Sequence, residues 1–138
     1  MIERYLWILG SSIFIVLAGL HLIYTFFTNK FSIRDAAVEE GMKRTFPVLT
    51  RKTTVWKAWI GFNASHSIGG IFFGTINLLF ACQYFFLLEN SLSLVLLTCA
   101  ISYFYLFLGF KYWFIIPLTG ILISSVCFSV ATIILLTK

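Results

Sequence analysis

Hydrophobic residues form four long stretches without a charge, and none of them alternates with polar residues at a period of two. These stretches cover residues 5–28, 58–88, 92–110 and 114–137. A helix of about 18 residues or more can cross a hydrocarbon core of ~30 Å, and backbone groups in lipid must be satisfied within a helix or a closed barrel. The pattern predicts an all-α membrane protein, an antiparallel four-helix bundle whose second span covers about 58–86.

Composition agrees with this prediction. The chain of 138 residues is 60% hydrophobic and 11% charged, with a mean hydropathy of +0.98, whereas soluble domains carry about 25% charged residues. The first stretch is too long for the core of a signal peptide and no small-residue cleavage site follows it, so we expect a retained helix. The four spans leave room for one domain, residues 1–138.

Positive charge is distributed unevenly along the chain. Eight of the ten basic residues lie between the first and second stretches or between the third and fourth: Lys30, Arg34, Lys43, Arg44, Arg51, Lys52, Lys57 and Lys111. Short loops rich in Lys and Arg remain cytoplasmic, so both termini are expected outside the cytoplasm. The formal net charge of +5 is explained by topology and membrane lipids, without a nucleic-acid partner.

The basic loop, residues 29–57, is predicted to contain a short amphipathic helix. Ser32 and Asp35 resemble a capping pattern, Gly41 would close the helix and Pro47 would end any continuation. We expect this helix to lie at the membrane interface. Four cations are candidates for binding lipid headgroups: Lys43, Arg44, Arg51 and Lys52. The alternative is a solvated loop that only fixes topology.

The stretch WKAWIGFNASHSIGGIFFG, residues 56–74, carries polar residues and glycines inside a predicted span. Helical spacing places Trp59, Asn63, His66 and Phe73 on one face. Because asparagine and histidine are costly against lipid, this face is expected to point into the bundle.

The two histidines of the chain are predicted to lie at the same depth. His21 precedes Thr28 by 7 residues, roughly 10 Å along a helix, and His66 follows Lys57 by 9 residues, roughly 13 Å. The first two helices run antiparallel, and both distances start from the basic side. His21, Asn63 and His66 are therefore candidates for one polar centre between these helices.

This centre has several interpretations. It could bind a hydrophobic small molecule such as a lipid, quinone or isoprenoid, with Tyr24, Trp59 and Phe73 around it. The histidines could instead join helices in a non-catalytic accessory or scaffold subunit, or could both ligate a haem b. Zinc is disfavoured, since no cysteine or carboxylate shares their depth. Whether the protein is an enzyme stays open.

Small residues in the same stretch predict close helix packing. The positions are Gly61, Ser65, Gly69, Gly70 and Gly74, the last two forming a GxxxG pair. Such rows let helices approach closely in lipid, either within the chain or in a homo-oligomer or a complex with another membrane protein.

Other motifs point to no reaction. The three cysteines, Cys82, Cys99 and Cys127, lie in separate spans without CxxC spacing. The sequence contains no HExxH or GxSxG motif and no phosphate-binding glycine loop.

Three segments resemble a family of small, four-span bacterial membrane proteins whose biochemical role is uncharacterised. They are HLIYTFF (21–27), the segment 46–74 with its WxGFNxSHSxG core, and KYWFIIP (111–117). The resemblance covers nearly the whole chain. It implies the four-helix fold and a bacterial inner-membrane location, and it assigns no ligand or activity.

Overall fold

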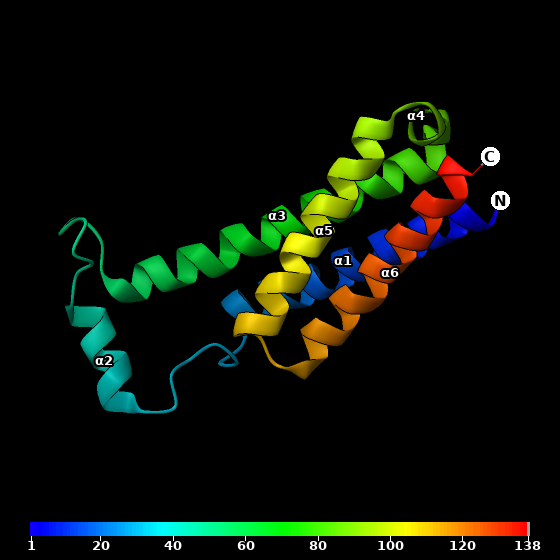
Figure 1. Cartoon of the computed structure of the whole chain (residues 1–138). Helices are drawn as coiled ribbons and strands as arrows, with labels where there is room; N and C mark the ends of the chain where they lie inside the picture. Colours follow the sequence, from blue (N-terminus) through cyan, green and yellow to red (C-terminus); the bar gives the residue numbers. More distant parts are fainter. Residues whose placement is uncertain (138) are drawn as a thin grey trace. The chain divides into compact units, whose positions relative to one another are not determined.

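The computed structural model describes residues 1–137, which form helices joined by turns and loops, with no strand among them (Figure 1). Its four long helices are α1 (Ile2–Phe27), α3 (Val55–Gln83), α5 (Leu92–Tyr112) and α6 (Ile115–Leu136). Two short helices are α2 (Ala36–Arg44) and α4 (Phe85–Asn90). Each long helix contains an 18-residue stretch with a mean hydropathy of 2.2, 1.3, 2.0 or 2.3, in chain order, and each is long enough to cross a membrane. The predicted fold class is confirmed: this is a multi-pass helical membrane protein.

Two helices begin earlier than the charge-free stretches. α1 starts at Ile2, so Glu3 and Arg4 belong to its first turn, and α3 starts at Val55, where the Thr54 hydroxyl accepts a hydrogen bond from the Lys57 N–H. The cause is the same in both cases: charged residues near the membrane surface can continue a helix, although a search for charge-free residues stops at them.

α3 ends at Gln83, three residues before its predicted end, and Arg4 closes it. The Arg4 guanidinium donates from Nε to the carbonyl of Ala81 at 2.7 Å and from Nη2 to the carbonyl of Cys82 at 2.6 Å. The last carbonyls of a helix lack partners within the helix. Arg4, in the first turn of α1, donates hydrogen bonds to two of these carbonyls. The chain then turns into α4, a helix that the hydrophobic pattern did not predict.

The chain divides into two compact units. The first, here called the bundle unit, contains Met1–Leu17 and the chain from Gly70 onward; the second, the loop unit, is Ala18–Gly69. In the bundle unit, the start of α1 and the end of α6 lie at the same end (Figure 1). Lys138, counted above with the basic residues, lies outside the described residues.

Aromatic rings fill the core of the bundle unit. The Phe14 ring centroid lies 4.7 Å from that of Phe73 and 5.3 Å from that of Tyr105, both edge to face. Trp7 meets Phe128 at 5.1 Å in the same geometry, which aromatic pairs prefer. These contacts join α1, α3, α5 and α6 into one core.

Asn77 joins three helices of the bundle unit through buried hydrogen bonds. Its Oδ1 accepts from Trp7 Nε1 at 3.0 Å and from Thr98 Oγ1 at 2.9 Å, and its Nδ2 donates to the Phe73 carbonyl at 3.0 Å. Among residues 1–137, every buried side-chain nitrogen or oxygen has a partner. The polar residues of the bundle thus hold helices together in a setting where lipid gives no hydrophobic drive between them.

Candidate functional site

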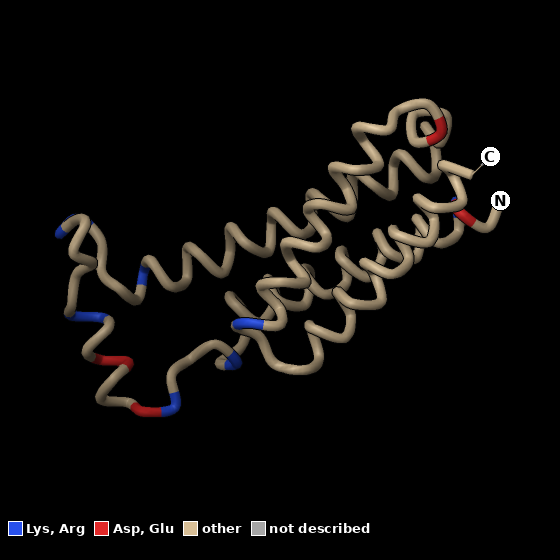
Figure 2. The backbone as a smooth tube through the Cα atoms, in the orientation of Figure 1, with Lys and Arg blue, Asp and Glu red and all other residues tan. Residues whose placement is uncertain are grey.

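The loop unit brings the predicted polar centre together on two helix segments. Ala18 to Phe27 form the last part of α1, and Val55 to Gly69 form the first part of α3. Charged residues gather in the segment between them, while the helices themselves are almost free of charge (Figure 2).

Asn63 orients His21. The Asn63 side chain donates from Nδ2 to the carbonyl of Trp59, one turn earlier, at 2.8 Å. Its Oδ1 therefore faces His21, whose Nε2 lies 3.0 Å away. Since an amide oxygen only accepts, His21 carries a proton on Nε2, and in the neutral imidazole Nδ1 is an acceptor.

His66 lies beside this pair, as its predicted depth requires. The ring centroids of His21 and His66 are 5.5 Å apart with the planes at 67°, and the Phe62 ring stacks with that of His66 at a centroid distance of 6.3 Å. Asn63 is only 6% exposed, whereas both imidazoles are half-buried. The centre therefore combines an ordered amide with two accessible rings.

Phe31 is part of this centre, and the sequence reasoning missed it. Its ring centroid lies 4.4 Å from that of His21, and its carbonyl accepts a hydrogen bond from Trp59 Nε1 at 3.2 Å. The loop after α1 is thereby fastened to the start of α3. The available signal was a lone aromatic residue in the polar sequence NKFS, which is typical of a loop anchored by one side chain.

The proposed wall residues differ in their surroundings. Tyr24 is 37% exposed, and no contact that places it on the rings is seen among the described residues. Phe73 belongs to the bundle unit, where it packs against Phe14, Tyr105 and Phe128. Trp59 contacts the cluster through its carbonyl and its indole N–H.

The small residues fall into two groups. A Cβ on Gly74 would lie 2.8 Å from the Ser11 carbonyl oxygen, so this glycine permits the close approach of α1 and α3 in the bundle unit, and Gly70 is also buried. In contrast, a Cβ on Gly61 would meet no atom within 4 Å. Ser65 and Gly69 are exposed as well, so this row stays open.

The short helix predicted in the loop is present as α2, but it begins later than the predicted cap at Ser32 and ends beyond Gly41. Asp35 is its N-cap and accepts from the N–H groups of Ala37 and Val38. The prediction that Gly41 closes the helix is wrong, because two ion pairs at i,i+4 spacing carry it on to Arg44.

The four candidate headgroup cations differ in their partners. Lys43 Nζ lies 2.6 Å from Glu39 and 5.2 Å from the Trp56 ring centroid, and Arg44 lies 2.8 Å from Glu40. Arg51 and Lys52 are exposed and form no ion pair within residues 1–137. The hydrogen bond to Lys43 lowers the pKa of Glu39, and the same bond raises the pKa of Lys43.

A metal site of three or more ligands is not found. Among the described residues no three His, Cys, Asp or Glu side chains gather in a metal-binding group. The cysteines are free thiols, and Cys99 lies 3.3 Å from the Thr132 hydroxyl.

Comparison of the chain with protein family models, with curated proteins and with solved structures finds no match. The class of protein is therefore defined by its own features. It is a four-helix multi-pass membrane protein with a His21–Asn63–His66 cluster where α1 and α3 adjoin the basic loop.

Proposed function

We propose that the protein binds a membrane-soluble small molecule with a polar head at the His21–Asn63–His66 cluster. The observation that carries the proposal is the bond between His21 Nε2 and Asn63 Oδ1, 3.0 Å long, with the His66 ring beside it. Asn63 is held by Trp59, so the donor and acceptor positions are set in advance. An ordered polar group with accessible rings on apolar helices suits an amphiphilic ligand.

The hydrogen-bonding pattern favours a ligand head that donates. Because His21 Nε2–H is used by Asn63, a neutral His21 offers only its Nδ1 lone pair. A hydroxyl-bearing head, such as that of a lipid, an isoprenoid alcohol or a quinol, would donate to it. An oxidised quinone has only acceptors and would depend on His66.

Haem is the less favoured ligand. Ligation of one iron by both histidines would require a lone pair on a ring nitrogen of each, and His21 could offer only Nδ1 while its Nε2 is bonded to Asn63. An absorbance spectrum of the purified protein tests this directly, since a Soret band that is lost in His21→Ala and His66→Ala would establish haem and replace the proposal.

Ligand binding is tested by mass spectrometry of extracts from protein purified in mild detergent. We expect a retained amphiphile in the parent protein. Its occupancy should fall about tenfold in His66→Ala and in His21→Gln, as expected for the loss of one good hydrogen bond. The glutamine amide can still donate to Asn63, so His21→Gln keeps the link between helices and removes the imidazole. Ser65→Ala on the exposed side of α3 is the control and should retain the ligand. Extracts without any enriched molecule would refute the proposal.

A second candidate function, that of an accessory or scaffold subunit, is favoured by the open row of Gly61, Ser65 and Gly69. An exposed row of small residues allows another helix to approach closely. Co-purification of a membrane protein, or a homo-oligomer, lost in Gly61→Leu and Ser65→Leu would support it. Gly74→Leu is unsuitable for this test, because Gly74 is packed against α1.

We further propose a bacterial inner membrane with both termini outside the cytoplasm. The support is the excess of Lys and Arg in the segments joining α1 to α3 and α5 to α6, together with the resemblance of the WxGFNxSHSxG core to bacterial four-span proteins. Protease or thiol-reagent access to Arg34→Cys in inverted and right-side-out vesicles tests the orientation.

A further inference from the structure

The segment joining α2 to α3 is a closed loop. The Val55 N–H donates to the Thr45 carbonyl at 2.9 Å and joins the two ends of the segment, here called the 45–55 loop. Inside it, the Thr50 N–H donates to the Pro47 carbonyl at 3.2 Å, and the Lys52 N–H donates to the Thr50 hydroxyl at 3.1 Å. Compact loops whose ends meet in this way are frequently functional.

Two apolar side chains occupy the turn at the tip of the 45–55 loop. Val48 is 109% exposed and Leu49 is 95% exposed, so neither packs against the rest of the loop unit. The turn between Pro47 and Thr50 holds both in this position. Adjacent aliphatic side chains presented by a closed turn are costly in water and favour an apolar environment.

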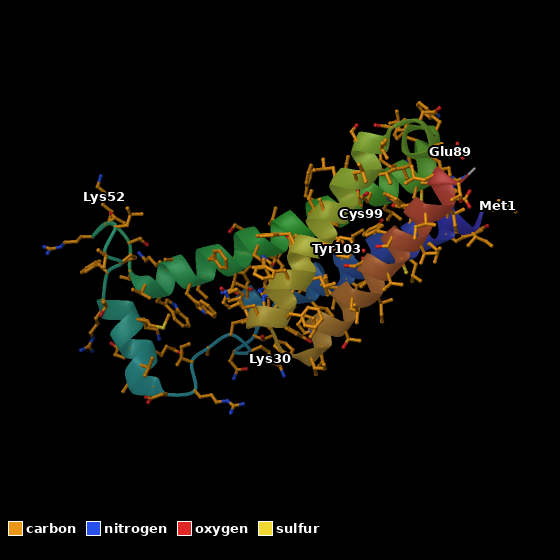
Figure 3. All side chains as sticks on the ribbon, viewed as in Figure 1. Met1, Lys30, Lys52, Glu89, Cys99 and Tyr103 are labelled. Carbon is orange, nitrogen blue, oxygen red and sulfur yellow. The ribbon has the colours of Figure 1, made fainter. Side chains whose placement is uncertain are left out.

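The side of the 45–55 loop that leads into α3 is basic. Arg51 and Lys52 are exposed and form no ion pair with any described residue, unlike Lys43 and Arg44. The labelled Lys52 side chain points away from the chain (Figure 3). An apolar tip with free cations next to it is complementary to a leaflet that contains anionic lipids.

The tip is also within reach of the bilayer. The base of the 45–55 loop is Val55, the first residue of α3, and Trp56 and Trp59 follow it as interfacial anchors. The three residues from Thr45 to Val48 span at most ~10 Å, and the headgroup layer of one leaflet is about 5–8 Å thick. The tip can therefore reach from the start of α3 to the edge of the acyl chains.

We infer that the 45–55 loop is a lipid-inserting element, in which Val48 and Leu49 enter the leaflet where α3 begins and Arg51 and Lys52 bind the phosphates of anionic lipids. This inference is independent of the ligand proposed above, because none of these residues contacts the histidine cluster. It assigns the loop a partner, the surface of the protein's own membrane.

The test uses the full chain in vesicles. A fluorescent probe sensitive to its environment is attached to Val48→Cys or Leu49→Cys in a Cys82→Ala background, since Cys82 is exposed and Cys127 is buried. The same probe at Glu40→Cys, an exposed position on α2, is the control. Vesicles contain phosphatidylcholine alone or with one quarter phosphatidylglycerol, and doxyl-labelled lipids serve as quenchers.

We expect the probes at Val48 and Leu49 to be quenched strongly in anionic vesicles and the probe at Glu40 weakly. Adding Arg51→Ala or Lys52→Ala should lower the ratio of inserted to free loop by about fivefold each. Equal quenching at Val48 and Glu40 in both kinds of vesicle would overturn the inference. Circular dichroism of each variant confirms that the helices are retained, so that a loss of quenching reports on the loop.

Discussion

A Cβ placed on Gly74 would lie 2.8 Å from the carbonyl oxygen of Ser11 and 2.7 Å from Cγ1 of Ile15, so α3 and α1 meet there with no space for a side chain. Gly74→Ala is expected to lower the free energy of unfolding by about 1–3 kcal/mol, the usual cost of overpacking. Unfolding in mixed detergent measures the change.

Gly61→Ala is the matched control for Gly74→Ala, because both replace a glycine within α3. A Cβ at Gly61 meets no atom within 4 Å, so the better helix propensity of alanine should stabilise this variant by up to about 1 kcal/mol. Equal effects at the two glycines would contradict the close approach at Gly74.

Asn77→Ala should destabilise the bundle unit, because it removes the acceptor of both Trp7 Nε1 and Thr98 Oγ1. Hydrogen bonds between membrane helices contribute about 0.6 kcal/mol on average, so losing two should cost about 1 kcal/mol. Thermal unfolding followed by tryptophan fluorescence measures it. Asn90→Ala, which removes an exposed bond to the Phe86 carbonyl, should change stability by less than about 0.5 kcal/mol.

The stability of α2 should depend on pH at both ends of the scale. Glu39 has a pKa below its ordinary 4.5 because Lys43 bonds to it. The stability that ionised Glu39 adds to α2 is therefore fully present above pH 4.5 and is lost as the pH falls through the folded pKa. The pKa of Lys43 is raised above 10.5. The stability that protonated Lys43 adds to α2 is therefore fully present below pH 10.5 and is lost as the pH rises through the folded pKa.

Amide exchange or NMR shifts of residues 36–44 would follow these two transitions. Lys43→Gln removes the partner, and in this variant the acid transition of Glu39 should move back up towards 4.5. An unchanged transition would contradict the ion pair as the cause. High salt should weaken the effect in the parent protein, because both groups are on the surface.

Trp59→Phe is expected to loosen the loop that follows α1. It removes the bond from Trp59 Nε1 to the Phe31 carbonyl, and one hydrogen bond of about 1 kcal/mol corresponds to a fivefold faster amide exchange in residues 29–34. Trp56→Phe is the control, since Trp56 stacks with Lys43 instead. A loop equally protected in both variants would show that Phe31 is held by its ring alone.

The sequence was sufficient for the features that depend on helical geometry. Absence of charge located the four long helices, and counting from the basic side placed His21 and His66 at one depth, where their rings do lie 5.5 Å apart. Both inferences use the rise per residue of a helix, the first to compare helix length with membrane thickness and the second to count depth from the basic side. Neither requires knowledge of how side chains pack.

Features that depend on contacts distant in sequence were not predictable in this way. Gly61 and Gly74 both belong to predicted packing rows of small residues, yet only Gly74 has another helix within 4 Å of an added Cβ. Phe31 stands out in the sequence as a lone aromatic residue, but its contacts with His21 and Trp59 follow only from the folded path of its loop. Arg4 looked like a flanking charge, although its partners are 77 and 78 residues away. Whether the histidine cluster holds a ligand stays a prediction.

The contact between Arg4 and the end of α3 also constrains the timing of synthesis. Arg4 leaves the ribosome early, and the Cys82 carbonyl it binds follows 78 residues later, which is roughly 4–16 s at elongation rates of about 5–20 residues per second. During this interval the guanidinium has to be solvated by water or lipid phosphates at the membrane surface. The first helix can therefore be inserted early, but its first turn reaches the final set of hydrogen bonds only after the third helix has crossed the bilayer.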